Sequence, residues 1–143
     1  MNEKYEFTGE TKNVEGRTLK RIRAKANFAE VKEGELGGWI EKGKNLSVYG
    51  NAWVSGDASV YCSARVSGDA MVKTSKDYLC IGPIGDNRFI TAFKTKDSFK
   101  ISAGCFLGTA EEFKEAVEKK YGKDSEYHLA LNLIQKRMKG GAE

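Results

Sequence analysis

Five consecutive six-residue units occupy residues 45–74, which read NLSVYG NAWVSG DASVYC SARVSG DAMVKT. The second place of each unit holds leucine or alanine, and the fourth place holds valine. The residues at these places are Leu46, Ala52, Ala58, Ala64 and Ala70, then Val48, Val54, Val60, Val66 and Val72. No helix has a period of six, whereas six residues accommodate a very short strand and a turn. The repeat therefore predicts a coil of parallel β-structure with its valines pointing inward.

The repeat resembles the left-handed hexapeptide β-helix, in which successive units form the sides of a triangular coil. A short array of this kind needs protected ends, because each unit buries its apolar face only against its neighbours. We therefore predict a mainly β protein with C-terminal helices. Its centre would be a short hexapeptide β-solenoid, left-handed and β-helix-like, capped by an N-terminal hairpin and by a C-terminal β-meander plus two helices.

The N-terminal segment predicts a hairpin with a long loop, since residues 5–7 and 19–24 alternate between apolar and polar side chains. Alternation places Arg21 and Arg23 on the same face of the second strand, two residues apart. The pair is a candidate anion clamp. A solvated strand face that keeps the protein soluble is the plainer alternative.

The composition changes at residues 75–77, which predicts a boundary between an N-terminal part, residues 1–74, and a C-terminal α+β module, residues 75–143. Beyond this boundary, apolar runs separated by turn residues predict an antiparallel meander. Its strands are expected over residues 78–81, 88–95 and 98–105. Thr109 and Glu112 have the spacing of a capping box, which predicts a helix from this point to Gly122. A second helix is expected to begin near Asp124.

The loop Gly82-Pro83-Ile84-Gly85 is glycine-rich and is followed by Arg88. Exposed backbone amides and a guanidinium are suited to holding phosphate, so Gly85 and Arg88 are candidate binding residues. A tight turn would use the same glycines, and this alternative remains open.

Aromatic side chains occupy the third and fifth places of the hexads. If the valines face inward, Trp53 at a third place and Tyr49 and Tyr61 at fifth places face outward. Exposed aromatic residues anchor protein partners or stack on bases, which makes Trp53 and Tyr61 candidate partner-binding residues. An interface within a homo-oligomer is the plainer explanation, because hexapeptide solenoids often associate side by side, and a homo-oligomer is therefore expected.

The residues that could support catalysis or metal binding are few and scattered. Cys62, Cys80 and Cys105 lack metal-ligand spacing and are expected to be small buried hydrophobes. The single histidine, His128, lies in the predicted second helix, far from the hexads. We therefore predict a protein that is not an enzyme and needs no metal or cofactor, with a hexapeptide acyltransferase as the less favoured alternative.

The net charge is +4 at pH 7, and a basic cluster within residues 17–25 contains no acid. This distribution suits an anionic partner and excludes a protein that imitates DNA. Direct nucleic-acid binding is an alternative that we do not favour. The chain has no apolar run near the ~20 residues that span a bilayer, and residues 1–12 are too polar for a signal peptide. A cytoplasmic protein without membrane association is expected.

Several phrases resemble a group of small proteins encoded by bacteriophages and prophages. The phrases are GRTLKRIR at residues 16–23, LGGWIE at 36–41, YLCIGPIGDNRFITAFKT at 78–95 and ISAGCFLGTAEEF at 101–113. The family more often has GPIGSR where this chain has Asp86 and Asn87 before Arg88. The resemblance implies a non-enzymatic interaction protein in the host cytoplasm. It would antagonise an antiphage defence by binding a host protein or by sequestering an anionic nucleotide. A structural, oligomeric solenoid protein is the alternative.

Overall fold

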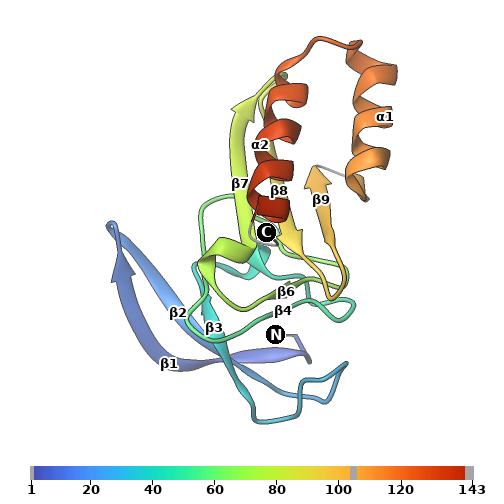
Figure 1. Cartoon of the computed structure of the whole chain (residues 1–143). Coiled ribbons are helices and arrows are strands. Elements are labelled where there is room, and N and C mark those ends of the chain that lie inside the picture. Colours follow the sequence, from blue (N-terminus) through green and yellow to red (C-terminus); the bar gives the residue numbers. More distant parts are fainter. Residues whose placement is uncertain (1, 104–105, 141–143) are drawn as a thin grey trace.

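The computed structural model describes residues 2–103 and 106–140, which form a mainly β protein with two C-terminal helices (Figure 1). The strands are β1 (Tyr5–Val14), β2 (Arg17–Ala24), β3 (Leu36–Ile40), β4 (Trp53–Val54), β5 (Ser59–Val60), β6 (Met71–Val72), β7 (Tyr78–Ile84), β8 (Arg88–Lys94), β9 (Phe99–Ala103) and β10 (Phe106–Gly108). The helices are α1 (Ala110–Tyr121) and α2 (Glu126–Gly140), and short 3-10 turns cover Gly43–Asn45 and Ser75–Asp77. In the described part of the chain, neither helix has the length and apolarity needed to cross a membrane.

The predicted N-terminal hairpin is present, but the prediction of a long loop between its strands was wrong. Strands β1 and β2 pair up to Val14 and Arg17, so the turn contains only Glu15 and Gly16. Both turn residues have positive φ, 50° and 82°, as a tight hairpin requires. The residues between the predicted strands belong to β1 instead, and a bulge between Phe7 and Thr11 accommodates Gly9.

The predicted β-solenoid was also wrong. In the described residues, the hexads contribute only three strands of two residues each, and these strands belong to two different sheets. Strands β4 and β6 form a parallel pair of their own, whereas β5 joins the N-terminal sheet in the order β1-β2-β3-β5. A six-residue period specifies which side chains point inward, but it does not specify the neighbour of each strand.

The inward positions of the repeat are largely as predicted. The alanines at the second place are fully buried, and four of the five valines are 0% exposed. Val48 in the first unit departs from the pattern and is 38% exposed. The hexads therefore supply the core of the N-terminal part of the molecule.

Two adjacent glycines of β3, Gly37 and Gly38, lie in direct contact with this core. A Cβ on Gly37 would stand 2.6 Å from the Cγ1 atom of Ile22, and one on Gly38 would stand 2.7 Å from the carbonyl oxygen of Ala58. These separations are far below a normal carbon contact. The glycine pair of the LGGWIE phrase thus allows the N-terminal sheet to approach the hexads closely.

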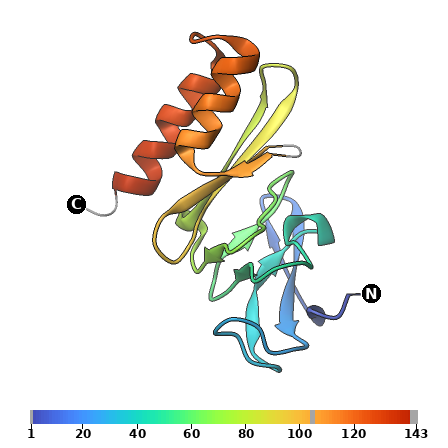
Figure 2. The same cartoon turned by 90° about the vertical axis from the view of Figure 1, so that its right-hand side faces the viewer.

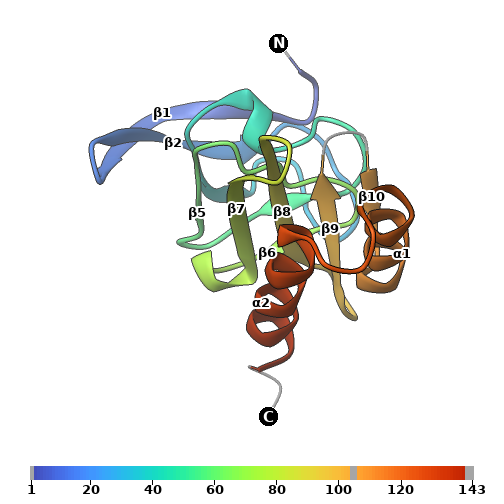
Figure 3. The same ribbon diagram turned by 90° about the horizontal axis from the view of Figure 1, so that it is seen from above.

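The C-terminal part is an antiparallel sheet in the order β10-β9-β8-β7, with α1 packed on β9 and β10 and α2 on β7 and β8 (Figure 3). Strand β8 has two buried faces. Ile90 and Ala92 pack with the helices, whereas Phe93 packs with the hexads. In Figure 2 the sheet consequently forms a middle layer between the helices and the rest of the molecule.

The capping box that was predicted for α1 is confirmed. The Thr109 hydroxyl accepts from the Glu112 amide at 3.2 Å, and the Glu112 carboxylate accepts from the Thr109 amide at 2.9 Å. The helix ends at Gly122, whose φ of 83° suits glycine. Part of β9's predicted range, residues 104 and 105, lies outside the described residues.

Candidate functional site

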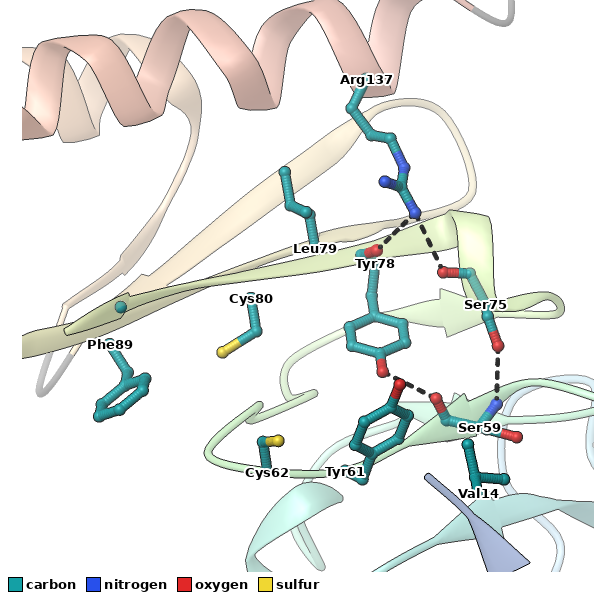
Figure 4. A pocket seen from close by; sticks show the side chains of 11 residues that line it. Val14, Ser59, Tyr61, Cys62, Ser75, Tyr78, Leu79, Cys80, Phe89 and Arg137 are labelled. Atoms are coloured by element: carbon teal, nitrogen blue, oxygen red, sulfur yellow. Dashed lines mark hydrogen bonds between the residues drawn. The ribbon is translucent and has the colours of Figure 1, made fainter. Parts of the chain in front are cut away.

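A cavity of about 520 Å³ opens where the hexads meet the C-terminal sheet (Figure 4). Its apolar walls include the rings of Tyr61, Tyr78 and Phe89. Arg137 of α2 reaches toward it from the other side of β7. Ligand pockets typically have volumes of roughly 300–1,000 Å³ and combine apolar walls with a few polar groups. The cavity meets this description.

Tyr78 fixes one wall of the cavity. Its hydroxyl donates to the carbonyl oxygen of Ser59 at 2.7 Å, and the Ser59 amide donates to the Ser75 hydroxyl at 3.1 Å (Figure 4). Burial raises the pKa of Tyr78 to about 12, so the phenol is neutral at physiological pH. These bonds connect β7 to the hexads and hold the ring in one place.

Arg137 is the charged residue among the described residues that line the cavity. Its acceptors in the described part of the chain are backbone carbonyls. The guanidinium donates to Ser75 at 3.3 Å and to Tyr78 at 3.4 Å. These bonds are long and the acceptors are neutral, so they leave the positive charge available to an anion. The cavity therefore combines aromatic walls with a guanidinium that forms no ion pair with a carboxylate of residues 2–103 or 106–140.

Two thiols, Cys62 and Cys80, also line the cavity. Both are free and half-buried rather than fully buried as predicted, and Cys105 lies outside the described residues. Burial raises the pKa of the Cys80 thiol. Cys62 has φ of 61° at a corner of the repeat where Gly50, Gly56 and Gly68 also have positive φ. A side chain in this conformation is strained, so the cavity wall includes one strained residue.

The predicted anion clamp, Arg21 and Arg23, is neutralised by the preceding strand. Arg23 donates to the Glu6 carboxylate at 2.9 Å, and Arg21 lies 3.7 Å from Glu10. Arg21 also donates to the carbonyl oxygen of Gly37 at 3.3 Å. The charges of both arginines are thus already paired within the hairpin, and a register shift in the pairing with β3 separates the two residues.

The predicted phosphate cradle is occupied by the chain's own carboxylates. The Gly85 amide donates to Glu126 at 2.6 Å, and Arg88 lies 3.4 Å from Asp86. Asp86 also accepts from the hydroxyls of Tyr121 and Tyr127, and these two bonds hold its pKa well below the usual range. The loop thus connects the β7–β8 turn to both helices.

The outward orientation predicted for Trp53 was wrong, because the side chain is 5% exposed and packs edge-on against Phe28 with ring centroids 5.4 Å apart. The loop that carries Phe28 covers this third place of the hexad. Tyr61 is half-buried at the cavity, and Tyr49 is 81% exposed. His128 is remote from the cavity. It lies 3.1 Å from Glu118 and therefore connects the two helices.

Sequence reasoning missed Arg137 and Tyr78. The two residues are far apart in the sequence, and only the packing of α2 on β7 brings them together. The chain matches no protein-family model, and a search of curated proteins finds no matching protein.

Proposed function

We propose that this chain is a non-enzymatic phage-type interaction protein that antagonises a host antiphage defence by sequestering an anionic nucleotide in the cavity beside Arg137. The observation that carries the proposal is the Arg137 guanidinium, which lines the cavity together with aromatic rings and whose acceptors among the described residues are backbone carbonyls. The phage resemblance of the sequence supports the biological role. Direct binding of a host protein is the second route, and it would use another surface.

The cavity offers complementary chemistry to the two parts of a nucleotide. An aromatic base can stack on tyrosine or phenylalanine rings, a contact worth about 1–3 kcal/mol per base. A phosphate can accept two parallel hydrogen bonds from a guanidinium, which is the geometry that arginine favours. Tyr61 and Phe89 would meet the base, and Arg137 would meet the phosphate.

The cavity's polar groups favour binding over turnover. The Tyr78 hydroxyl already donates to Ser59, and the Ser75 hydroxyl accepts from the Ser59 amide. Among the described residues that line the cavity, neither a histidine nor a carboxylate stands beside these hydroxyls. A serine or tyrosine nucleophile needs such a base for activation. A nucleotide held here would be retained unchanged.

Isothermal titration calorimetry with ADP-ribose and with a cyclic dinucleotide as probes tests the proposal. We expect Arg137→Gln to weaken binding about tenfold or more, which corresponds to about 1.4 kcal/mol. Tyr61→Ala should also weaken it. Arg21→Ala and Arg88→Ala are the matched controls, because their charges are paired. The assignment would be refuted if neither probe binds, or if Arg21→Ala loses as much affinity as Arg137→Gln. Thermal unfolding of each variant excludes misfolding.

A further inference from the structure

The corner formed by Val48 and Tyr49 projects from the hexads between two grooves. Tyr49 is 81% exposed and Val48 is 38% exposed, although the equivalent valines of the other units are fully buried. Grooves of about 350 and 550 Å³ lie on the two sides, and both residues line both grooves. An aromatic and an aliphatic side chain exposed together beside a groove have the character of an interface anchor.

The backbone of this corner is fixed by its own hydrogen bonds. The Tyr49 amide donates to the Ser47 hydroxyl at 3.1 Å, and the same hydroxyl donates to the Tyr49 carbonyl oxygen at 3.2 Å. The Lys4 ammonium donates to the Ser47 carbonyl oxygen at 2.9 Å. Gly50 then turns the chain with φ of 73°. The exposed ring is thus presented by a rigid support, which reduces the entropy lost when a partner binds.

The smaller groove has a definite charge. Phe106 and Leu107 provide apolar wall, and Leu107 is 46% exposed. Lys44 and Arg65 are its charged residues, and among the described lining residues none is acidic. Neither cation forms an ion pair with a carboxylate in the part of the chain that the structure describes. The groove is therefore apolar at its wall and positively charged.

We propose that this groove docks an extended acidic segment of a partner protein. One apolar or aromatic side chain of the segment would lie against Tyr49 and Leu107, and its carboxylates would pair with Lys44 and Arg65. Complementary charge would speed the encounter and exclude basic partners. A nucleic acid fits less well, because its affinity depends on many phosphate contacts and the groove offers two cations. A second copy fits less well, because the chain is itself positive, at +4.

The proposed docking surface is separate from the nucleotide cavity. The two share none of their lining residues. The inference therefore goes beyond the proposed function, and failure of one assignment leaves the other intact.

Fluorescence anisotropy with a labelled peptide that carries one phenylalanine among glutamates tests the proposal. Two matched peptides replace every glutamate by glutamine or by lysine. We expect Tyr49→Ala and Arg65→Gln each to weaken binding of the acidic peptide about fivefold or more, and the glutamine peptide to bind about tenfold more weakly than the acidic one. Leu129→Ala and Lys119→Gln are controls that remove another exposed leucine and another exposed cation.

Three kinds of result would overturn the proposal. The first is no binding of the acidic peptide at concentrations up to about 1 mM, which would mean a binding free energy weaker than about −4 kcal/mol. The second is equal binding of the acidic and glutamine peptides, or unchanged binding in Tyr49→Ala. The third is an oligomer, measured by light scattering, that Tyr49→Ala dissociates, because the surface would then hold a second copy. Calorimetry of Tyr49→Ala with ADP-ribose separates these outcomes from the nucleotide proposal.

Discussion

The N-terminal sheet and the cavity surround their arginines in opposite ways. On the sheet, Arg17, Arg21 and Arg23 each lie within 3.7 Å of a glutamate oxygen. At the cavity, Arg137 meets carbonyl oxygens at 3.3–3.4 Å. The arginines in the most basic stretch of the sequence therefore have acidic partners, whereas Arg137 has none among the described residues. A cluster of basic residues in the sequence therefore indicates an anion-binding site only if the folded chain places no carboxylates beside it.

The close contact between β3 and the hexads joins the sheet that carries the paired arginines to the core, and breaking it should have the largest effect. We expect Gly37→Ala to lower the free energy of unfolding by about 2–3 kcal/mol, because a buried site must expand around the new methyl group. Its Cβ would lie 2.6 Å from Ile22 and 2.7 Å from Trp53. Urea denaturation measures the loss.

Gly43→Ala is the matched control for that substitution. The nearest atom to its Cβ would be the Tyr5 hydroxyl at 3.9 Å, which is an ordinary contact. We expect a change within about 0.5 kcal/mol, as for most substitutions away from packed sites. Equal losses in Gly37→Ala and Gly43→Ala would contradict the role of the close approach.

The sequence predicted the local structure well and the pairing of strands poorly. The repeat identified Val54, Val60, Val66 and Val72 as inward, because burial at a fixed period leaves a direct mark on residue type. The same period does not record that β5 would pair with β3 while β4 pairs with β6. Pairing depends on the approach of β3, for which the glycines of LGGWIE were the only signal.

The candidate site was less predictable for the same physical reason. Arg21 and Arg23 were visible as a cluster, but the carboxylates opposite them come from β1 through hairpin pairing. The sequence did not indicate Arg137 as a site residue, because its charge becomes part of the cavity only when α2 packs beside Tyr78. Trp53 was misplaced because a loop from outside the repeat covers it. Charge balance and covering loops are tertiary properties, and periodicity does not encode them.

Lys4 is a cation in a third kind of environment, because it is buried. Its effect on the free energy of unfolding can be measured by changing the pH. Lys4 is 7% exposed, and burial lowers its pKa to about 8. The unfolded chain keeps the proton up to the ordinary pKa of 10.5, so the unfolded state binds more protons above about pH 8 and stability rises with pH. The Ser47 carbonyl and the Phe28 ring favour the charged form and reduce the gain to about 1–2 kcal/mol.

Chemical denaturation at about pH 8 and pH 9.5 measures this gain, since a pKa difference changes stability only between the two values. The raised pKa values of Cys80 and Tyr78 act in the opposite direction, Cys80 from near its ordinary value of 9.0 and Tyr78 above pH 10. Both groups remain in Lys4→Met, so the difference between wild type and variant measures the contribution of Lys4. Lys4→Met should remove the rise. A rise of the same size in Lys4→Met would assign the pH dependence to another group.

Relief of the backbone strain at Cys62, in the wall of the cavity, should have a smaller effect, and it should increase stability where Gly37→Ala lowers it. Cys62→Gly should raise the free energy of unfolding by about 0.5–1 kcal/mol, because glycine relieves the left-handed conformation at some cost in chain entropy. Thermal unfolding measures the gain. Gly56→Ala is the reverse control at an equivalent corner, where φ is 59° and a Cβ would lie 2.9 Å from the Lys73 carbonyl oxygen. A less stable Cys62→Gly would mean that packing of the thiol outweighs the strain.

The smallest effect is expected at the Arg23–Glu6 pair, whose side chains are 42% and 40% exposed. A double-mutant cycle should give a coupling of about 0.5 kcal/mol or less, because water screens exposed ion pairs. Glu6→Gln should then release the Arg23 charge without unfolding the sheet. Inorganic pyrophosphate should perturb the Arg23 Nε resonance more strongly in this variant than in the wild type. Equal perturbation in both would mean that the glutamate does not neutralise Arg23, and that paired and unpaired arginines attract anions alike.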